Sequence, residues 1–368
     1  MTVASSLLLR LSTGALRCMS STHQQVVPFM EPLHVLGGGN IGMLFAASIR
    51  AAFPSYPICL LLREHHRSRI DPEDNNVIVC LMGSGRSSRP RLVPVPAQII
   101  GDKSLSQRPI RNLLITTKAY SAVDAVKDVH NRLDVASGAS IVVLCNGALA
   151  VKDELELMKS VSPDDKINLT LATTTHGAYQ VEGVSDMFRF IHTGKGATFV
   201  EDHPTLSQLF DQSGLNSKSI TQEEMTIMLW QKLAANCAIN PLTALCDCEN
   251  GMLLDKEQQL AQATKKLPNI YQIIQEVALV AQFTLGKNSS QEAAPLDFES
   301  LSAFVHKVIN DTAHNRSSML QDVTRRQKTE VDYLNGFVVE KGRATGVDAT
   351  ANEDLCRRMK ALWRSYAL

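Results

Sequence analysis

Short apolar runs and helical patterns alternate along the first half of the chain. The apolar runs lie within the segments LHVLGGGNIG, YPICLLLREHHR, RNLLITTKAY, SIVVLCNGAL and KINLTLATTTHGAY, and the helical patterns include IGMLFAASIRAAF and AVDAVKDVHNRL. Short β-rich runs separated by amphipathic helices predict parallel strands joined by crossover helices. The polar segment 83–91, GSGRSSRPR, predicts a surface loop.

After about residue 220 the pattern changes to helical periodicity, which begins with TQEEMTIMLWQKLAANCAIN and continues to the C-terminus. A length of 368 residues is enough for two domains, each with its own core. We therefore expect an α/β protein in which a doubly wound sheet domain, residues 29–220, precedes an all-helical domain, residues 221–368. Two domains imply a cleft between them.

The segment 229–245, LWQKLAANCAINPLTAL, predicts a buried helix that carries a row of polar groups. Lys232, Asn236 and Asn240 are four residues apart, so they stack on nearly the same face, at the margin of the apolar side. Pro241 cannot donate a backbone hydrogen bond and disfavours helical geometry at the residue before it, so we expect the helix to kink or break there. A break would free backbone groups for a ligand.

Composition and charge narrow the possible partners. Lys plus Arg and Asp plus Glu both number 37, so the formal net charge is zero, and no broad basic field favours nucleic acid or an anionic membrane. No apolar run reaches the about 18 residues that a spanning helix needs. The eight cysteines include Cys246 and Cys248 but no paired CxxC spacing, which favours a reducing compartment. We expect small-molecule partners, and the sequence leaves a homo-oligomer open.

The N-terminus differs in composition from the rest of the chain. Residues 1–28 are rich in Ser, Thr and Leu and place Arg10 and Arg17 on one face of a possible helix. They contain no acidic residue, since the first acid in the chain is Glu31. This pattern resembles a mitochondrial presequence. The alternative is a disordered tail on a cytoplasmic protein, and in either case we place the segment outside the fold.

Gly37, Gly39 and Gly42 form G-x-G-x-x-G directly after the predicted strand LHVL and directly before a predicted helix. In this context, backbone amides and the helix N-terminus hold the pyrophosphate of a dinucleotide, which predicts a Rossmann-type domain. The residues expected to contact the cofactor there are Gly37, Gly38, Gly39, Asn40, Ile41 and Gly42.

The next predicted strand, ICLLL, ends in Arg63, where NAD enzymes usually have an acid that binds the ribose 2′-hydroxyl. A guanidinium at this place suits a 2′-phosphate, with Arg67 and Arg69 as additional positive charge, so we expect NADPH. Glu64 is the competing possibility, because it could bind a ribose hydroxyl instead. Lys118, at the end of a later strand, is a further cofactor candidate or else a surface lysine.

The motifs LGGGNIG, TTKAY, CNGAL, TTTHGA, WQKLAANCAINPLTAL, NRSSMLQD and TEVDYLNG occur in this order, and together they resemble ketopantoate reductase, also called 2-dehydropantoate 2-reductase. The resemblance covers roughly residues 33–365. It implies reduction of ketopantoate to pantoate with NADPH, on the route to pantothenate and coenzyme A. It also implies that no metal takes part.

The resemblance assigns roles to particular residues. Lys232 matches the catalytic lysine, and Glu330 matches the active-site glutamate, which also contacts the cofactor. The matches to substrate-binding residues are Asn236, Asn240, Asn250 and Ser318, and the matches at the nicotinamide end of the cofactor are Asn146, which also reaches the substrate, and Ala178.

A hydride that arrives at a ketone leaves negative charge on its oxygen, so Lys232 could donate the proton, and uncharged asparagines could orient the substrate. Glu330 could equally be an acid in the first turn of a helix, and His176 and His192 are rival proton donors.

The alternative functions are a reductase of another small 2-keto acid and a non-catalytic NADP(H) sensor. A sensor would not need the set of Lys232, the asparagines, Ser318 and Glu330.

Overall fold

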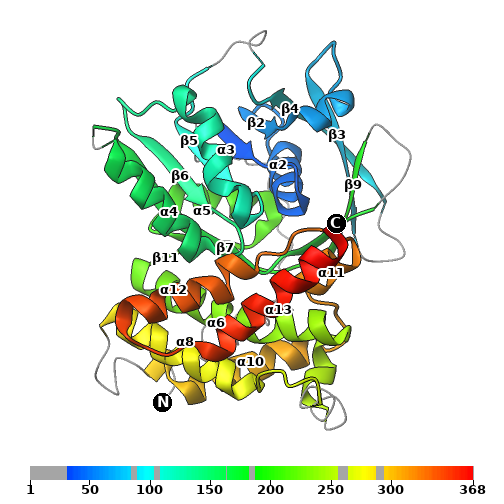
Figure 1. Cartoon of the computed structure of the whole chain (residues 1–368). Helices are drawn as coiled ribbons and strands as arrows, with labels where there is room; N and C mark the ends of the chain where they lie inside the picture. Colours follow the sequence, from blue (N-terminus) through cyan, green and yellow to red (C-terminus); the bar gives the residue numbers. More distant parts are fainter. Residues whose placement is uncertain are drawn as a thin grey trace, which may run out of the picture.

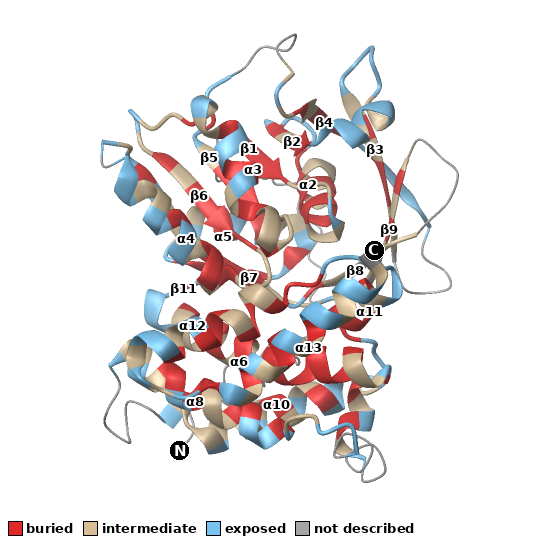
Figure 2. Cartoon of the chain, viewed as in Figure 1, coloured by how far each residue is buried: buried red, intermediate tan, exposed pale blue. Residues whose placement is uncertain are grey.

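The computed structural model describes residues 31–83, 89–102, 108–162, 164–181, 187–255, 264–286 and 294–367. The predicted presequence and residues 84–88 of the predicted surface loop lie outside the described residues. Figure 1 shows a sheet domain stacked on a helical domain. Buried residues concentrate in the strands and on the inner faces of the helices, as Figure 2 shows.

The described residues form an 11-stranded sheet in the order β11-β10-β7-β6-β5-β1-β2-β4-β3-β9-β8. Its strands are β1 (Leu33–Leu36), β2 (Ile58–Leu62), β3 (Asn76–Gly83), β4 (Arg91–Ile99), β5 (Asn112–Ile115), β6 (Ala139–Val143), β7 (Ile167–Thr174), β8 (Gly177–Gln180), β9 (Phe188–Gly194), β10 (Thr198–Glu201) and β11 (Ser217–Ile220).

The strands β4, β2, β1, β5, β6 and β7 are parallel neighbours, which confirms the predicted Rossmann-type arrangement. All four residues of β1 are buried, as expected for a central parallel strand that is covered on both faces. The expectation of parallel strands does not hold everywhere, because β3 is antiparallel to β4 and β10 is antiparallel to β7. The sheet is therefore mixed at both ends.

Helices cover both faces of the parallel part: α2 (Asn40–Ala52) and α5 (Pro204–Phe210) share one apolar cluster, and α3 (Ala122–Val129) and α4 (Ala148–Val161) share another. Only residues 175–176 separate β7 from β8, although the two strands are far apart in the hydrogen-bonding order. Since α2 contacts β2, β3, β4, β8 and β9, the sheet bends around this helix. The single predicted run KINLTLATTTHGAY is thus two strands.

The second half of the chain is helical, as predicted. Its helices are α6 (Gln222–Cys246), α8 (Ile270–Leu285), α10 (Phe298–Asp311), α11 (Ser318–Thr324), α12 (Asn335–Thr345) and α13 (Thr350–Ala367). They enclose one core around α6. Short helical turns in the chain are η1 (Glu64–Arg69), η2 (Ala119–Ser121), η3 (His130–Arg132), η4 (Asp211–Leu215), η5 (Asn250–Leu254), η6 (Ala294–Leu296) and η7 (Val331–Tyr333). Within the described residues, no helix combines the length and apolarity needed to cross a bilayer.

Helix α6 begins at a capping box, in which Thr221 accepts from the Glu224 amide and the Glu224 carboxylate accepts from the Thr221 amide. The last strand ends at Ile220 and α6 starts at Gln222, so we place the division between the two domains at residues 220–221.

We expected α6 to kink or break at Pro241, and the break is wrong, because the helix continues through this residue to Cys246. A proline at this position leaves the carbonyl of Cys237 without its usual helical donor. The Asn335 side chain of α12 supplies the missing bond, since its Nδ2 donates to the Cys237 carbonyl over 3.0 Å. The freed carbonyl is therefore used inside the core and is not offered to a ligand.

Two glycines at the junction of β1 and α2 provide a matched test of packing. A Cβ added at Gly42 would lie 2.2 Å from the Gly37 carbonyl oxygen, whereas one added at Gly39 would meet its nearest atom at 3.9 Å. We expect Gly42→Ala to lower the free energy of unfolding by about 2–3 kcal/mol, since backbone must shift. Gly39→Ala should cost less than about 1 kcal/mol. Urea denaturation measures both, and equal losses would contradict the predicted packing.

Candidate functional site

The glycine turn between β1 and α2 forms one wall of a cleft of about 290 Å³. Gly37 has a φ of +123°, and its Cβ position is 3.0 Å from Thr117, so only glycine fits there. The Asn40 side chain donates to the carbonyl of Ala178 over 2.9 Å, which brings these two predicted cofactor residues together. The cleft is also lined by Leu36, Gly38, Gly39, Leu61, Arg63, His65, His66, Ile100, Lys118, Tyr120, Ser121 and Ala125.

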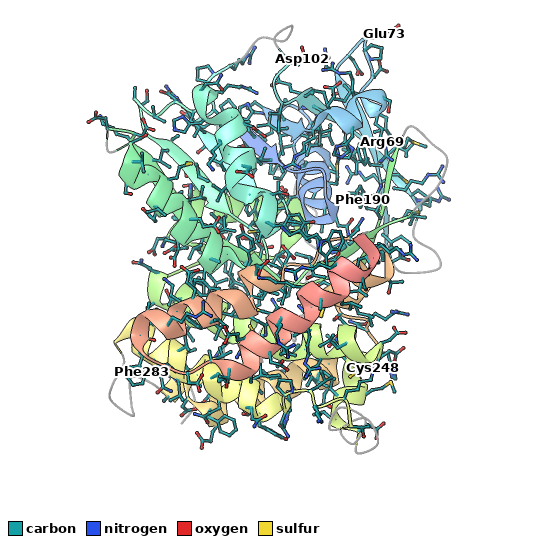
Figure 3. All side chains as sticks on the ribbon, viewed as in Figure 1. Arg69, Glu73, Asp102, Phe190, Cys248 and Phe283 are labelled. Atoms are coloured by element: carbon teal, nitrogen blue, oxygen red, sulfur yellow. The ribbon has the colours of Figure 1, made fainter. Side chains whose placement is uncertain are left out.

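Arg63 lies in this cleft, and its two neighbouring arginines are engaged elsewhere. Arg67 donates to both carboxylate oxygens of Glu64, over 2.6 and 3.0 Å, and to Asp102 over 2.8 Å. Arg69 lies 4.6 Å from the centre of the Phe188 ring. Figure 3 shows Arg69 on the side of the sheet domain that carries β9. The additional positive charge predicted from Arg67 and Arg69 is therefore neutralised or directed away from the cleft.

Lys118 joins the sheet domain to the helical domain. Its Nζ donates to both carboxylate oxygens of the buried Asp322, over 3.1 and 2.8 Å, and lies 3.6 Å from Glu330. Burial alone would lower the pKa of Lys118, but Glu330 and Asp322 outweigh it and raise the pKa. The lysine is thus a cation, and a cofactor that binds it must share it with these two carboxylates.

Glu330 lies directly before η7 and is 4% exposed. Its Oε1 accepts from the Ala119 amide over 2.8 Å, and its Oε2 accepts from the Asn146 side chain over 3.4 Å. Both partners belong to the sheet domain. The carboxylate therefore does not serve as an ordinary acid in a helix's first turn, but connects the two domains beside Lys118.

Lys232 reaches from α6 to the carboxyl end of β7. Its Nζ donates to the Thr173 hydroxyl over 3.0 Å and to the Thr174 carbonyl over 3.2 Å. Burial lowers the pKa of Lys232, against opposing effects of Cys145 and Glu330. A lysine with a lowered pKa releases its proton more readily than an exposed one.

Lys232 lines a cavity of about 20 Å³, and the other lining residues are Cys145, Asn146, Gly147, Ala148, Leu149, Leu229, Leu233, Asn236, Tyr333 and Leu334. The sheet domain, α6 and η7 meet here. A cavity of this volume holds about one water molecule. A larger ligand can enter only if the residues that line the cavity move apart.

The other predicted substrate residues lie further along α6 and its neighbours. Asn240 is buried, and its Nδ2 lies 3.5 Å from Oγ of Ser318, which is exposed at the start of α11. Asn250 is also buried. Its Nδ2 donates to Thr312 over 2.9 Å, while its Oδ1 is buried without a hydrogen-bond partner. That orphaned acceptor could take a ligand hydroxyl.

The structure thus brings the predicted residues together in two groups. Lys232, Asn236 and Asn146 line one cavity, next to Glu330. Asn240 and Ser318 form a second group, and neither they nor Asn250 line that cavity. Among the described residues, no cluster of side chains could hold a metal ion.

His176 and His192, the rival proton donors, are used structurally. His176 Nε2 donates to the Leu215 carbonyl over 2.9 Å. Its Nδ1 lies 2.9 Å from His192 Nε2 and accepts from the Gly196 amide over 3.0 Å. Neither histidine lines the Lys232 cavity.

Sequence reasoning did not identify Thr173, Asp322 or Tyr333, although each contacts a predicted residue or lines its cavity. All three residues stand in quoted motifs: Thr173 in TTTHGA, Asp322 in NRSSMLQD and Tyr333 in TEVDYLNG. The motifs alone did not single them out. For Thr173 the reason is that its meeting with Lys232 depends on how α6 packs against β7.

Two family models match the chain. The model described as "Ketopantoate reductase PanE/ApbA" matches residues 33–205, and the model described as "Ketopantoate reductase PanE/ApbA C terminal" matches residues 224–362. The 2-dehydropantoate 2-reductase of Shigella flexneri is 34% identical over 261 residues, which are 69% of this chain and 75% of the relative. The enzyme of the same name from Vibrio cholerae is 34% identical over 260 residues, or 69% and 78% of the two chains.

Solved structures share the fold. A PanE/ApbA family ketopantoate reductase from Ralstonia eutropha JMP134 has a TM-score of 0.69 at 21% identity, covering 91% of this chain and 99% of the other. D-mandelate dehydrogenase with NADH and anilino(oxo)acetate has a TM-score of 0.69 at 18% identity, covering 92% and 100%. A dimeric ketopantoate reductase from Staphylococcus aureus has a TM-score of 0.64 at 14% identity, covering 91% and 99%.

Proposed function

Because the chain belongs to the ketopantoate reductase family, we propose that it reduces 2-dehydropantoate to (R)-pantoate with NADPH, in the biosynthesis of pantothenate and coenzyme A. One observation carries the proposal: Lys232 lines a cavity together with Asn146 of the sheet domain and Asn236 of its own helix. A protein that only senses NADP(H) has no need of a half-buried lysine at this junction.

The residues present fit a nicotinamide dinucleotide, since the turn at Gly37 and Gly42 admits no Cβ and leaves the start of α2 open to a phosphate. When bound, the cofactor supplies the hydride for the C2 ketone. We assign its binding to the glycine turn, Asn40, Ile41, Arg63, Lys118, Asn146, Ala178 and Glu330.

NADPH is favoured over NADH by the arrangement around Arg63. Glu64, which could have bound a ribose hydroxyl, accepts from Nε and Nη2 of Arg67 and does not line the cleft. Arg63 remains as the charged side chain of this segment that faces the cofactor cleft, and a guanidinium pairs well with a phosphate.

We assign Lys232 as the proton donor to the oxygen at C2, where negative charge develops as the hydride arrives. Asn236, Asn240, Asn250 and Ser318 would orient the substrate's hydroxyl and carboxylate groups. Glu330 would sit between cofactor and substrate, where its charge favours the protonated form of Lys232. The small volume of the cavity implies that the domains separate before the substrate enters.

Another 2-keto acid is the second candidate substrate, because D-mandelate dehydrogenase has the same fold. Steady-state oxidation of NADPH with ketopantoate, phenylglyoxylate and pyruvate would decide between them. The proposal requires the highest kcat/KM for ketopantoate. The dimeric relative from Staphylococcus aureus makes a homodimer a reasonable proposal for this chain as well.

Lys232→Ala should lower the rate of single-turnover hydride transfer about 10²- to 10⁴-fold, the usual contribution of a positioned acid. NADPH affinity should change little, because the cofactor cleft belongs to the sheet domain. Lys218→Ala, which removes an exposed lysine of β11, is the control and should behave as wild type. A wild-type rate in Lys232→Ala would show that the lysine is only a polar residue on a helix.

Arg63→Ala should weaken NADPH binding about tenfold or more and leave NADH binding nearly unchanged, since only NADPH presents the 2′-phosphate. Arg67→Ala is the matched control, because that guanidinium is engaged by Glu64 and Asp102. Fluorescence titration of both nucleotides measures the difference. Equal losses for NADPH and NADH in Arg63→Ala would refute the assignment.

We also propose that the N-terminal segment directs the chain to mitochondria. A reporter fused to residues 1–30 should then be imported, and a chain that begins near Val26 should keep full activity. A reporter that stays in the cytosol would favour the cytoplasmic alternative.

A further inference from the structure

Two acceptors at the carboxyl end of β7 hold the Lys232 amine. An ammonium group has three N–H donors, and two of them are used, by the Thr173 hydroxyl at 3.0 Å and the Thr174 carbonyl at 3.2 Å. The third donor is left over, and Lys232 lines the same cavity as Asn146 and Asn236. The two threonines therefore determine how the amine is presented to a ligand.

Both acceptors are held firmly by the sheet. Thr173 is 3% exposed and is paired with Phe199 of β10. The Thr174 hydroxyl lies 3.2 Å from that of Thr198 and 3.3 Å from the Ala197 carbonyl. It also accepts from the His176 amide over 3.2 Å, and the His176 ring is itself anchored to Leu215 and Gly196. This network fixes the direction of the Thr174 carbonyl.

The chemistry of these acceptors suits an amine that gives up a proton and regains it. A carboxylate in direct contact would stabilise the ammonium strongly and oppose proton release. A carbonyl and a hydroxyl are neutral and orient the group with less effect on its charge. A hydroxyl can also reverse its role: it accepts from the ammonium and donates to the lone pair of the neutral amine. A carbonyl can only accept.

We propose that Thr173 is a positioning residue for the reduction: its hydroxyl, with the Thr174 carbonyl, holds the Lys232 amine in both protonation states and leaves one N–H for the substrate oxygen. This inference rests on the proposed function. In the reaction, the hydride supplied by the cofactor forms the new C–H bond at C2, and an N–H bond of Lys232 breaks as its proton moves to the oxygen. The resulting neutral amine recovers a proton from water after product leaves.

Removal of the Thr173 hydroxyl has a defined effect on pH dependence. The ammonium loses an acceptor, so its pKa should fall further below the ordinary value, and the alkaline limb of the rate should move to lower pH. The titratable groups that act on Lys232 are Cys145, at the end of β6, and Glu330, beside η7, while β7 presents it only with threonines. Both groups are retained in the Thr173 variants.

The test compares Thr173→Val, Thr173→Ala and Thr173→Ser in the full-length chain with NADPH and ketopantoate. Valine and alanine should slow single-turnover hydride transfer about 10- to 100-fold, as expected for a misplaced group, with smaller changes in KM and NADPH affinity. They should also shift the alkaline limb to lower pH. Serine should restore both the rate and the pH profile. Thr170→Val, on the same strand, controls for loss of a threonine from β7 and should behave as wild type.

The outcomes separate this inference from the proposed function. If valine, alanine and serine give the same rate and pH profile while Lys232→Ala is inactive, the positioning role is wrong and the proposed function stands. If Lys232→Ala also keeps the wild-type rate, the lysine is not the proton donor and the inference falls with that assignment. If the wild-type chain does not oxidise NADPH with ketopantoate, the proposed function itself fails. Should the valine variant not fold, serine and alanine still decide, because they differ by one oxygen atom, and equal behaviour of these two would overturn the inference.

Discussion

Continuity of α6 through Pro241 is the constraint on which the site depends, because a break at the proline would take Asn240, the residue before it, off the face that it shares with Lys232 and Asn236. The proline removes a donor inside a buried helix, and an unpaired carbonyl there would cost about 1–3 kcal/mol. Asn335 supplies the bond to the Cys237 carbonyl, and its Nδ2 also donates to Asn352 of α13 over 2.9 Å. The same amide therefore ties α6, α12 and α13 together. The lysine near the middle of α6 reaches β7 from a helix that is packed against these neighbours in the core.

The site also requires one relative placement of the two domains, and the contacts between them are polar and buried. Glu330 accepts from the Ala119 amide and from Asn146, and Asp322 accepts from Lys118. Buried charges of this kind add little net stability but are costly to leave unpaired, so they favour one relative placement of the domains. Gly147 makes that placement possible, since a Cβ at its φ of +67° would lie 2.8 Å from Tyr333. The same contacts close the cavity beside Lys232.

Local pattern was sufficient for the parallel strands, the glycine turn and the helical second half, because each depends on periodicity or on a short spacing. It failed where distant segments decide the outcome. The break expected at Pro241 does not occur because Asn335, 94 residues later in the chain, completes the bond. The run after residue 166 became two strands because the sheet bends around α2. Arg67 and Arg69 were expected to add charge to the cofactor cleft, but Asp102 and Phe188 engage them, and neither partner can be read from their immediate sequence.

Binding of a substrate in the closed cavity and binding of a cofactor in the cleft would each break contacts between the two domains. A cavity of about 20 Å³ excludes a keto acid, so its lining must move apart before substrate enters. If the two domains separate there, Glu330 must release Asn146. Lys118 must likewise give up existing contacts when a ligand binds, because its bonds to Asp322 compete with those it would make to a cofactor. A dinucleotide that takes over Lys118 would weaken one interdomain contact. Substrate entry would then be easier after cofactor binding than before it, because fewer interdomain bonds remain to be broken. On the proposed assignment of Lys118 to the cofactor, its contacts with Asp322 and Glu330 would couple the two ligands through the interface between the domains.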